Sequence, residues 1–344
     1  MTTNRYRIGF YGFGKRARNI YLPLIRKFKE KYEVSGFFRR NSNLATGDSQ
    51  LLNLAYHKNP SDLFKCSDAI IISVPESAQE ECLQSVSSFE GTVLLETPVS
   101  SPRVVELSKG MKVGVIEQWI HTPVEQIKSL IYSTGTLERP RIVQNNFRSY
   151  DYHAIAQMRS YLSAKTPRLV SCFASSVHLP RHFGNSGDLL KEQLETFDMS
   201  TIQMTDGALI QHNFSYAHKT SPLRGIQSMN CISNNGSILT GRIQDKTNDC
   251  EIFDVRILEN ENVKTHNSVI EYEEGQMSSI TLSSIGIAWK TPLIGLNDQE
   301  IAISKILENA ESGALYSAKD AFIDSMIMRA VKIAGQNNEI VRFQ

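Results

Sequence analysis

A glycine-rich turn between a short apolar strand and a helical pattern is the feature that most constrains the fold of this chain. Gly12-Phe13-Gly14-Lys15-Arg16-Ala17 has the spacing GxGxxA and follows directly on the apolar residues 6–11. The first glycine allows a sharp turn, the second lets the backbone approach a pyrophosphate, and the small sixth residue lets helix and strand pack closely. The phosphates then lie at the free amides of the helix N-terminus. The turn therefore predicts a dinucleotide-binding unit, with a plain strand–helix turn as the alternative.

Apolar strands alternate with helical patterns over the first third of the chain. After residues 6–11, the segments 33–38, 69–74, 93–95 and 113–116 are short, apolar and rich in β-branched residues. Continuous apolar strands of this kind are typical of sheets that are covered on both faces. The alternation predicts a Rossmann domain with a doubly wound parallel sheet over residues 1–120.

The pattern changes after about residue 120. A helix is expected at 123–132, a strand at 141–147 and a helix at 154–162. Four further strands without intervening helices are expected at 207–217, 226–241, 251–260 and 263–272, and two helices near 297–311 and 318–334. Consecutive strands favour antiparallel pairing. We therefore expect an α/β protein with a C-terminal α+β domain, residues 121–344, built on a large open, mainly antiparallel sheet. Its closing helices either stay with that domain or pack back on the first. Residues 183–200 are polar and are interpreted as a surface excursion or lid.

The composition of the chain indicates which kinds of molecule it binds. The chain has 344 residues, with 37 basic and 36 acidic residues and a net charge of +1. This balance gives no general attraction to nucleic acid or to anionic membranes. No apolar run approaches the roughly 20 residues that span a bilayer, and the five scattered cysteines are typical of reduced thiols. We expect a cytoplasmic protein that binds a small-molecule substrate, with no metal.

The residues after the second strand indicate which cofactor the turn would bind. NAD-binding domains place an acid at this tip, where it binds the ribose 2′-hydroxyl. Here the sequence is Arg39-Arg40-Asn41-Ser42. Guanidinium groups suit a 2′-phosphate. NADP is therefore the predicted cofactor, and NAD is the alternative. If no nucleotide binds here, the two arginines are interpreted as part of a solvated basic loop.

Further cofactor contacts are expected where the later strands end, since the carboxyl ends of parallel strands border the nucleotide crevice. The predicted cofactor-binding residues are Gly12, Phe13, Gly14, Lys15, Arg16, Arg39, Arg40, Ser42, Ser73, Val74, Pro75, Glu76, Glu96, Thr97 and Gln118.

His153 is the first candidate for catalysis, because histidine titrates near neutral pH and serves as general acid or base. Tyr152 and Thr97 are the other catalytic candidates, and Trp119, His121, Asp151 and His178 are expected to face the substrate. The alternatives are a structural histidine at a helix start, a Thr97 hydroxyl bonded to local backbone and a Trp119 that only packs. His178 and His182 flank Pro180, which favours a loop over a helical metal site.

Several motifs in this order resemble the glucose–fructose oxidoreductase/inositol dehydrogenase (Gfo/Idh/MocA) family. They are Gly12-x-Gly14-x-x-Ala17, Ser73-Val74-Pro75-Glu76, Glu96-Thr97-Pro98, Thr122-Pro123 with its helix and Gly135, and the closing segments 312–317 and 321–324. The resemblance implies a Rossmann domain and an α/β domain whose free sheet face builds homodimers or homotetramers. The family's Glu-Lys-Pro is Glu96-Thr97-Pro98 here, so a threonine replaces the lysine that reaches the nicotinamide.

The resemblance also places His153 at the position of the family's substrate-domain histidine. The Gly-rich run that usually precedes it is replaced by Arg148-Ser149-Tyr150, and Gln79 stands where a histidine is frequent. These departures argue against sugar-alcohol dehydrogenation. Biliverdin reductases, similar over the first domain, also lack the lysine and reduce a non-sugar substrate.

Three hypotheses for function follow. The first is an NAD(P)H-dependent oxidoreductase that works as a reductase of a small or medium organic substrate. The second is a catalytically silent nucleotide-binding protein that acts as a sensor or binds a partner. The third keeps the cofactor bound and re-reduces it within one cycle.

Overall fold

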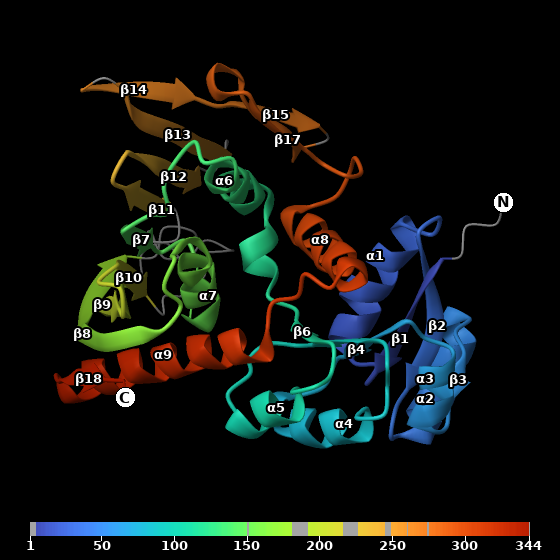
Figure 1. Cartoon of the computed structure of the whole chain (residues 1–344). Helices are drawn as coiled ribbons and strands as arrows, with labels where there is room; N and C mark the ends of the chain where they lie inside the picture. The colour runs from blue at the N-terminus through green and yellow to red at the C-terminus, as the bar shows by residue number, and fades with distance from the viewer. Residues whose placement is uncertain are drawn as a thin grey trace. The chain divides into compact units, whose positions relative to one another are not determined.

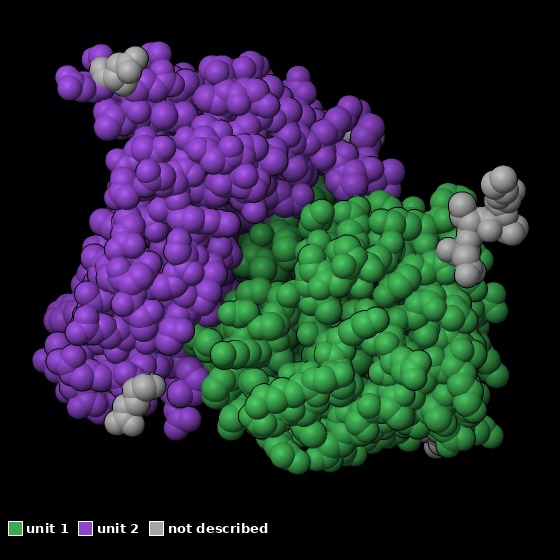
Figure 2. Space-filling view, in the orientation of Figure 1, with its two compact units in different colours: residues 1–121, 297–325 green, residues 122–296, 326–344 purple. Residues whose placement is uncertain are grey.

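The computed structural model describes residues 5–149, 151–180, 192–215, 226–244, 249–259, 261–273 and 275–343. The chain forms two compact units (Figure 2). Unit 1 comprises residues 1–121 and 297–325, and unit 2 comprises residues 122–296 and 326–344.

Unit 1 is built on a six-stranded parallel sheet in the order β3-β2-β1-β4-β5-β6 (Figure 1). Its strands are β1 (Tyr6–Tyr11), β2 (Tyr32–Phe38), β3 (Tyr56–His57), β4 (Ala69–Ile72), β5 (Thr92–Leu95) and β6 (Val113–Val115). Its helices are η1 (Ala17–Tyr21), α1 (Leu22–Lys27), α2 (Ser42–Leu52), α3 (Pro60–Lys65), η2 (Glu76–Ala78), α4 (Gln79–Ser85), α5 (Pro102–Leu107), η3 (Gln118–His121), α8 (Asp298–Ser312) and the start of α9 (Ala318–Asn337).

The parallel sheet follows from the apolar strands at its centre. Every residue of β4 and β5 is buried, as both faces of these strands are covered. Helices α4 and α5 contribute Leu83 and Val104 to the same core, and Ala321 of α9 joins them. Burying a leucine or valine side chain in this way stabilises the unit by about 1.5–3 kcal/mol. The predicted doubly wound sheet is confirmed.

Unit 2 is built on a nine-stranded sheet in the order β14-β13-β12-β11-β7-β10-β9-β8-β18; among the described residues, β7 and β10 are the one pair of its strands that runs parallel. Its strands are β7 (Ile142–Asn146), β8 (Pro167–Pro180), β9 (Glu192–Met204), β10 (Leu209–Ser215), β11 (Ile226–Ser233), β12 (Gly236–Gln244), β13 (Asp249–Glu259), β14 (Asn262–Asn267) and β18 (Ile340–Arg342). A second sheet holds β15 (Val269–Glu273), β16 (Gln276–Leu282) and β17 (Ile287–Lys290), with η5 (Ser283–Ile285) between the last two. The helices are α6 (Pro123–Ser133), α7 (Asp151–Tyr161) and the rest of α9. The expected mainly antiparallel sheet is confirmed.

The expectation of one strand over 226–241 is wrong, because β11 and β12 form a hairpin there. The chain turns after Ser233, and Gly236 opens β12 with φ +156°. A Cβ at Gly236 would lie 2.1 Å from the carbonyl oxygen of Arg256 on β13, so the backbones approach too closely for any side chain. The Asn234-Asn235-Gly236 sequence is a turn signal that an unbroken-strand interpretation overlooks.

The expectation that His178 lies in a loop is also wrong. His178 is in β8 and pairs with Leu194 of β9. Pro180 is the last residue of β8, so the proline ends the strand and does not prevent His178 from lying in it. Residues 192–200 of the polar run belong to β9, and residues 183–191 and His182 lie outside the described residues. Apolar residues at exposed positions, such as Phe173 and Met199, and polar residues at buried positions, such as Asp198, hide the period of these strands from a hydrophobicity pattern.

No helix in the described part of the chain is long and apolar enough to cross a membrane.

Candidate functional site

The glycine turn lies where the order of the parallel sheet reverses. Strands β1 and β4 are neighbours at its centre, and the chain continues from β1 to β2 on one side and from β4 to β5 on the other. Open sheets of this order hold their ligands at the carboxyl ends of the two central strands. Gly12 follows β1 and Ser73 follows β4, so the two segments predicted to bind the cofactor flank this switch point.

Gly12 fixes the contact between these two segments. Its φ is +84°, and its N–H donates to the carbonyl oxygen of Phe38 at 3.0 Å. A Cβ here would lie 2.6 Å from Cγ1 of Val74 and 2.7 Å from the carbonyl oxygen of Ser73. Since both the left-handed backbone and the close approach exclude a side chain, only glycine serves at this position.

Gly14 faces open space instead. A Cβ at this residue would meet no atom within 4 Å. The flanking residues anchor the turn: Ala17 is buried, and the buried ring of Phe13 stacks on Phe37 with centroids 4.4 Å apart. A bare backbone held on a packed turn is the form that a pyrophosphate requires, so these residues fit a dinucleotide.

Arg16, Glu96 and Gln118, all predicted to bind the cofactor, are joined in one network. Nε of Arg16 lies 2.7 Å from Oε1 of the buried Glu96, and its Nη2 donates to Oε1 of Gln118 at 3.1 Å. The hydroxyl of Tyr21 donates to Glu96, and Nε2 of Gln299 donates to Gln118 at 3.0 Å. Burial and then the charge of Glu96 raise the pKa of Tyr21 well above its ordinary value, so it stays a donor. No local sequence signal pointed to Tyr21 or Gln299.

Gln79 holds the turn that carries Thr97. Its buried Nε2 donates to the carbonyl oxygens of Glu96 at 2.8 Å and of Pro98 at 3.1 Å. The Thr97–Pro98 peptide bond is cis, and Thr97 itself is partly buried directly beyond β5. The glutamine therefore has a backbone-holding role at this strand end.

The two arginines after β2 already carry ionic partners. Nη1 of Arg39 lies 2.7 Å from Oδ2 of Asp48, and Nη1 of Arg18 lies 3.1 Å from the other oxygen of that carboxylate. Arg40 pairs with Glu81 at 2.6 Å, and both of those side chains are largely exposed. The acid near this tip is Asp48 of α2, ten residues beyond the end of β2, which is why the strand-end rule did not reveal it.

The other predicted residues are distributed between the two units. In unit 1, Lys15 is exposed, Val74, Pro75 and Glu76 follow β4, and Ser42 begins α2. Trp119 and His121 lie in η3, beside Gln118. Burial and then the charge of Lys305 lower the pKa of His121 to about 4, so this imidazole is neutral at pH 7.

In unit 2, Asp151, Tyr152 and His153 form the first turn of α7. His153 is 6% exposed, and its ring centroid lies 4.2 Å from that of Tyr152. Oδ2 of Asp151 lies 3.5 Å from Nζ of Lys332. His178 is exposed on β8. The structure thus brings three of the predicted residues together on one helical turn.

His212 on β10 was not predicted. It is fully buried, and its Nδ1 lies 3.0 Å from Nδ2 of Asn145 on β7. Burial lowers the pKa of His212 to about 4. A neutral imidazole in this position is therefore part of the support beneath α7.

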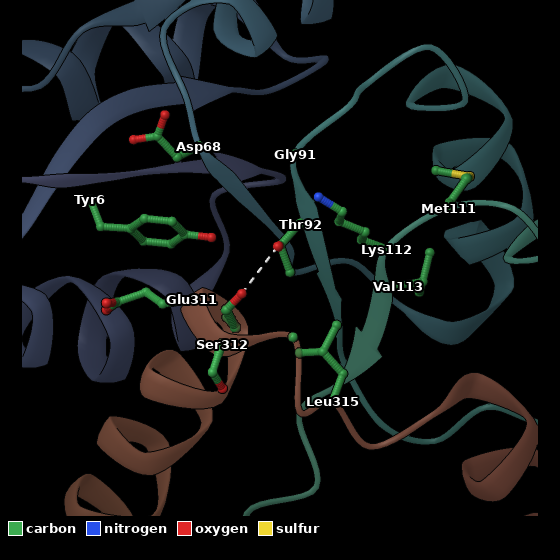
Figure 3. Close-up of a pocket in the computed structure, with 12 residues that line it drawn as sticks. Tyr6, Asp68, Gly91, Thr92, Met111, Lys112, Val113, Glu311, Ser312 and Leu315 are labelled. Carbon is green, nitrogen blue, oxygen red and sulfur yellow. Dashed lines mark hydrogen bonds between the residues drawn. The ribbon is translucent and has the colours of Figure 1, made fainter.

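A pocket of about 630 Å³ lies at the other end of the parallel sheet (Figure 3). Tyr6, Thr92 and Val113, from the amino ends of β1, β5 and β6, line it together with the last turn of α8. Oγ1 of Thr92 donates to the carbonyl oxygen of Ala310 at 3.2 Å. None of the predicted site residues lines this pocket.

Comparison with known proteins supports the fold through structure alone. No protein-family model matches the sequence, and no curated protein sequence is similar to it. An oxidoreductase from Thermotoga maritima is 17% identical, with 98% of each chain covered and a TM-score of 0.60.

Two other solved structures are 12% identical. One is an oxidoreductase from Agrobacterium radiobacter in complex with NAD+, L-tartaric acid and magnesium, which covers 98% of each chain with a TM-score of 0.65. The other is the WlbA dehydrogenase from Bordetella pertussis in complex with NADH and UDP-GlcNAcA, which covers 99% of each chain with a TM-score of 0.61. At these identities the likeness establishes a shared two-part α/β fold over nearly the whole chain.

We predict a pH-dependent contribution of His212 to stability. The folded protein keeps this imidazole neutral down to about pH 4, whereas an unfolded histidine binds its proton near pH 6.5. The unfolded state therefore binds more protons between these values, and stability falls as the pH falls through this window, by roughly 3 kcal/mol in all. Thermal unfolding of the wild type and His212→Asn from pH 7.5 to 4 should show their difference shrinking with acid. A constant difference contradicts the assignment.

Proposed function

We propose that this protein is an NAD(P)H-dependent oxidoreductase that reduces a small or medium organic substrate. The observation that carries the proposal is the glycine turn at the β1/β4 switch point, where Gly12 is wedged against Ser73 and Val74 while Gly14 presents bare backbone. Two solved proteins of the same fold support it, one an oxidoreductase with NAD+ bound and the other a dehydrogenase with NADH bound.

The bound nicotinamide would supply the hydride. The residues of the chain would hold the cofactor and the substrate and would supply the proton to the substrate. The network of Arg16, Glu96 and Gln118 fixes the end of β5, which borders the crevice. Thr97 lacks the ammonium of a lysine, so it orients by hydrogen bonding and leaves proton delivery to another group. We assign that proton to His153, with Tyr152 as the alternative donor. General acid catalysis of this kind is worth about 10²–10⁴ in rate.

We also propose that NADP is preferred and that the protein assembles as a homodimer or homotetramer through the sheet of unit 2. Arg39 and Arg18 share the single carboxylate of Asp48, which leaves a net positive charge beside the tip of β2 for a 2′-phosphate. Exposed apolar side chains on the large sheet, among them Phe173 and Met199, support the second part.

Gly14→Val tests the cofactor site. A side chain at Gly14 meets open space in the folded protein. The variant should therefore have the same melting temperature as the wild type, while its affinity for NADPH should fall by at least about a hundredfold. Calorimetric titration and thermal unfolding measure the two effects. Gly12→Ala is the contrasting variant, because its Cβ would clash with Ser73 and Val74, so it should lose stability. Wild-type NADPH affinity in Gly14→Val would remove the basis of the proposal.

Arg39→Ala tests the cofactor preference. A charge-assisted contact contributes about 1.5–3 kcal/mol, so NADPH affinity should fall about ten- to a hundredfold while NADH affinity stays nearly constant. Arg5→Ala, which removes a guanidinium paired with Glu33 at the amino end of the sheet, is the matched control. Equal wild-type affinities for NADPH and NADH would rule out the preference.

His153→Ala tests the proton donor. We expect kcat to fall at least about tenfold while the NADPH dissociation constant is unchanged, because His153 acts on the substrate and not on the nucleotide. The assay follows NADPH oxidation against a panel of aldehydes, ketones and imines. Wild-type turnover in the variant would show a structural histidine. A wild-type protein that binds NADPH but oxidises it with no member of the panel supports the silent nucleotide-binding protein instead.

A further inference from the structure

Two neighbouring asparagines at the end of β7 make contacts on opposite faces of the large sheet. Asn145 is fully buried, and its side chain pairs with both backbone groups of Ser149. Nδ2 donates to the carbonyl oxygen of Ser149 at 3.1 Å, and Oδ1 accepts from the Ser149 N–H at 3.3 Å. One amide therefore closes the connection between β7 and α7 onto the strand that it leaves.

The backbone of this connection needs such support. Phe147 has φ +58° and Asp151 has φ +52°, both in the left-handed region that residues with a Cβ rarely occupy. Such conformations persist only where the surroundings hold them, and they concentrate at functional sites. The Phe147 N–H donates to the carbonyl oxygen of Asn213 at 3.0 Å, and Oγ of Ser149 donates to Oε1 of Gln157 on α7 at 2.6 Å. The connection is thus tied to the sheet at its start and to α7 beyond.

The orientation of the Asn145 amide also sets the tautomer of His212. Because Oδ1 of Asn145 accepts from Ser149, its Nδ2 is the atom that faces His212, and Nδ1 of His212 must accept. The imidazole proton then sits on Nε2, which is buried without a hydrogen-bond partner among the described residues. Oγ of Ser200 donates to the carbonyl oxygen of His212 at 3.1 Å, which fixes the histidine from β9.

We propose that Asn145 is a positioning residue of the reductase: by clamping Ser149, it sets where α7 begins and so presents Tyr152 and His153 to the substrate. This inference rests on the proposed function, in which those two side chains deliver the proton. Asn145 itself contacts neither substrate nor cofactor in this role. It acts through the loop backbone, with His212 as its own anchor.

The chain offers a matched control in Asn146. This residue is of the same type and one position along β7, and it also makes two side-chain hydrogen bonds, accepting from Asn213 at 2.7 Å and donating to Ser228 at 3.0 Å. Its side chain points to the face opposite Asn145 and makes no bond to Ser149. Asn146→Ala therefore removes a comparable number of side-chain hydrogen bonds and leaves the bonds between Asn145 and Ser149 intact.

The experiment compares the full chain with Asn145→Ala, Asn145→Asp and Asn146→Ala, using NMR of ¹⁵N-labelled protein. In Asn145→Ala the Ser149 amide should exchange with solvent roughly tenfold faster, as expected for the loss of one hydrogen bond. The His153 ring signals should shift, while those of His57 in unit 1 stay in place. In the wild type, His212 should show the neutral tautomer with its proton on Nε2.

Asn145→Asp retains an acceptor for the Ser149 N–H and loses the donor to the Ser149 carbonyl, so it should restore slow exchange of that amide in part. In the NADPH oxidation assay, Asn145→Ala should lower kcat about tenfold with an unchanged NADPH dissociation constant, and Asn146→Ala should match the wild type. If Asn145→Ala is too unstable to purify, Asn145→Asp carries the same comparison.

Unchanged Ser149 exchange in both Asn145 variants would overturn the proposal, as would an equal increase in Asn146→Ala. Faster exchange with unchanged His153 signals and unchanged kcat would make the clamp merely structural, which also overturns it. The NMR measurements need no turnover. A wild type without reductase activity therefore refutes the proposed function and leaves the clamp itself separately measurable.

Discussion

The close contact between Gly12 and the end of β4 is the constraint on which the nucleotide half of this structure depends. A backbone at φ +84°, packed within van der Waals distance of Ser73 and Val74, forces the chain to turn sharply where the order of the sheet reverses. Beyond that turn Gly14 faces open space, and η1 begins three residues later at Ala17. The side of the contact that follows β4 is held rigid, because every residue of β4 and of its neighbour β5 is buried.

Around this turn, polar side chains are used to hold backbone and charge in place. Gln79 binds the carbonyls on either side of Thr97, and Arg16 satisfies the buried carboxylate of Glu96. In unit 2 the same principle recurs where Asn145 pairs with both backbone groups of Ser149. Breaking one partner of such a buried pair leaves the other unsatisfied, at a cost of about 1–3 kcal/mol. These groups therefore specify geometry beyond what apolar packing provides.

The sequence predicted the parts of the fold and site that are encoded locally. The glycine spacing, the apolar run of β4 and the strand–helix alternation are each short-range patterns, and the parallel sheet follows from them. The sequence predicted that Arg16 and Glu96 both belong to the cofactor crevice. It did not predict the contact between them. Asp48 and Gln299 were not predicted, because each reaches the site from a helix whose position depends on tertiary packing.

The same limit explains the failures in the second half. In β8 and β9 the exposed positions include apolar Phe173 and Met199, and the buried positions include polar Asp198 and Ser200, so the alternation of apolar and polar residues does not stand out. Pro180 also suggested a loop, although it only ends a strand. The contact that anchors Asn145 to His212 depends on β7 and β10 being parallel neighbours, because the two residues are 67 positions apart along the chain. Nothing in the local pattern around Asn145 or His212 indicates that these two side chains meet.

Native mass spectrometry of the wild-type chain incubated with NADPH, NADH or ATP tests the central claim most directly. If the glycine turn is a dinucleotide site, each chain should gain the mass of one NADPH molecule, with less occupancy by NADH and none by ATP at the same concentration. No dinucleotide adduct at saturating NADPH, or equal adducts with all three nucleotides, would contradict the account.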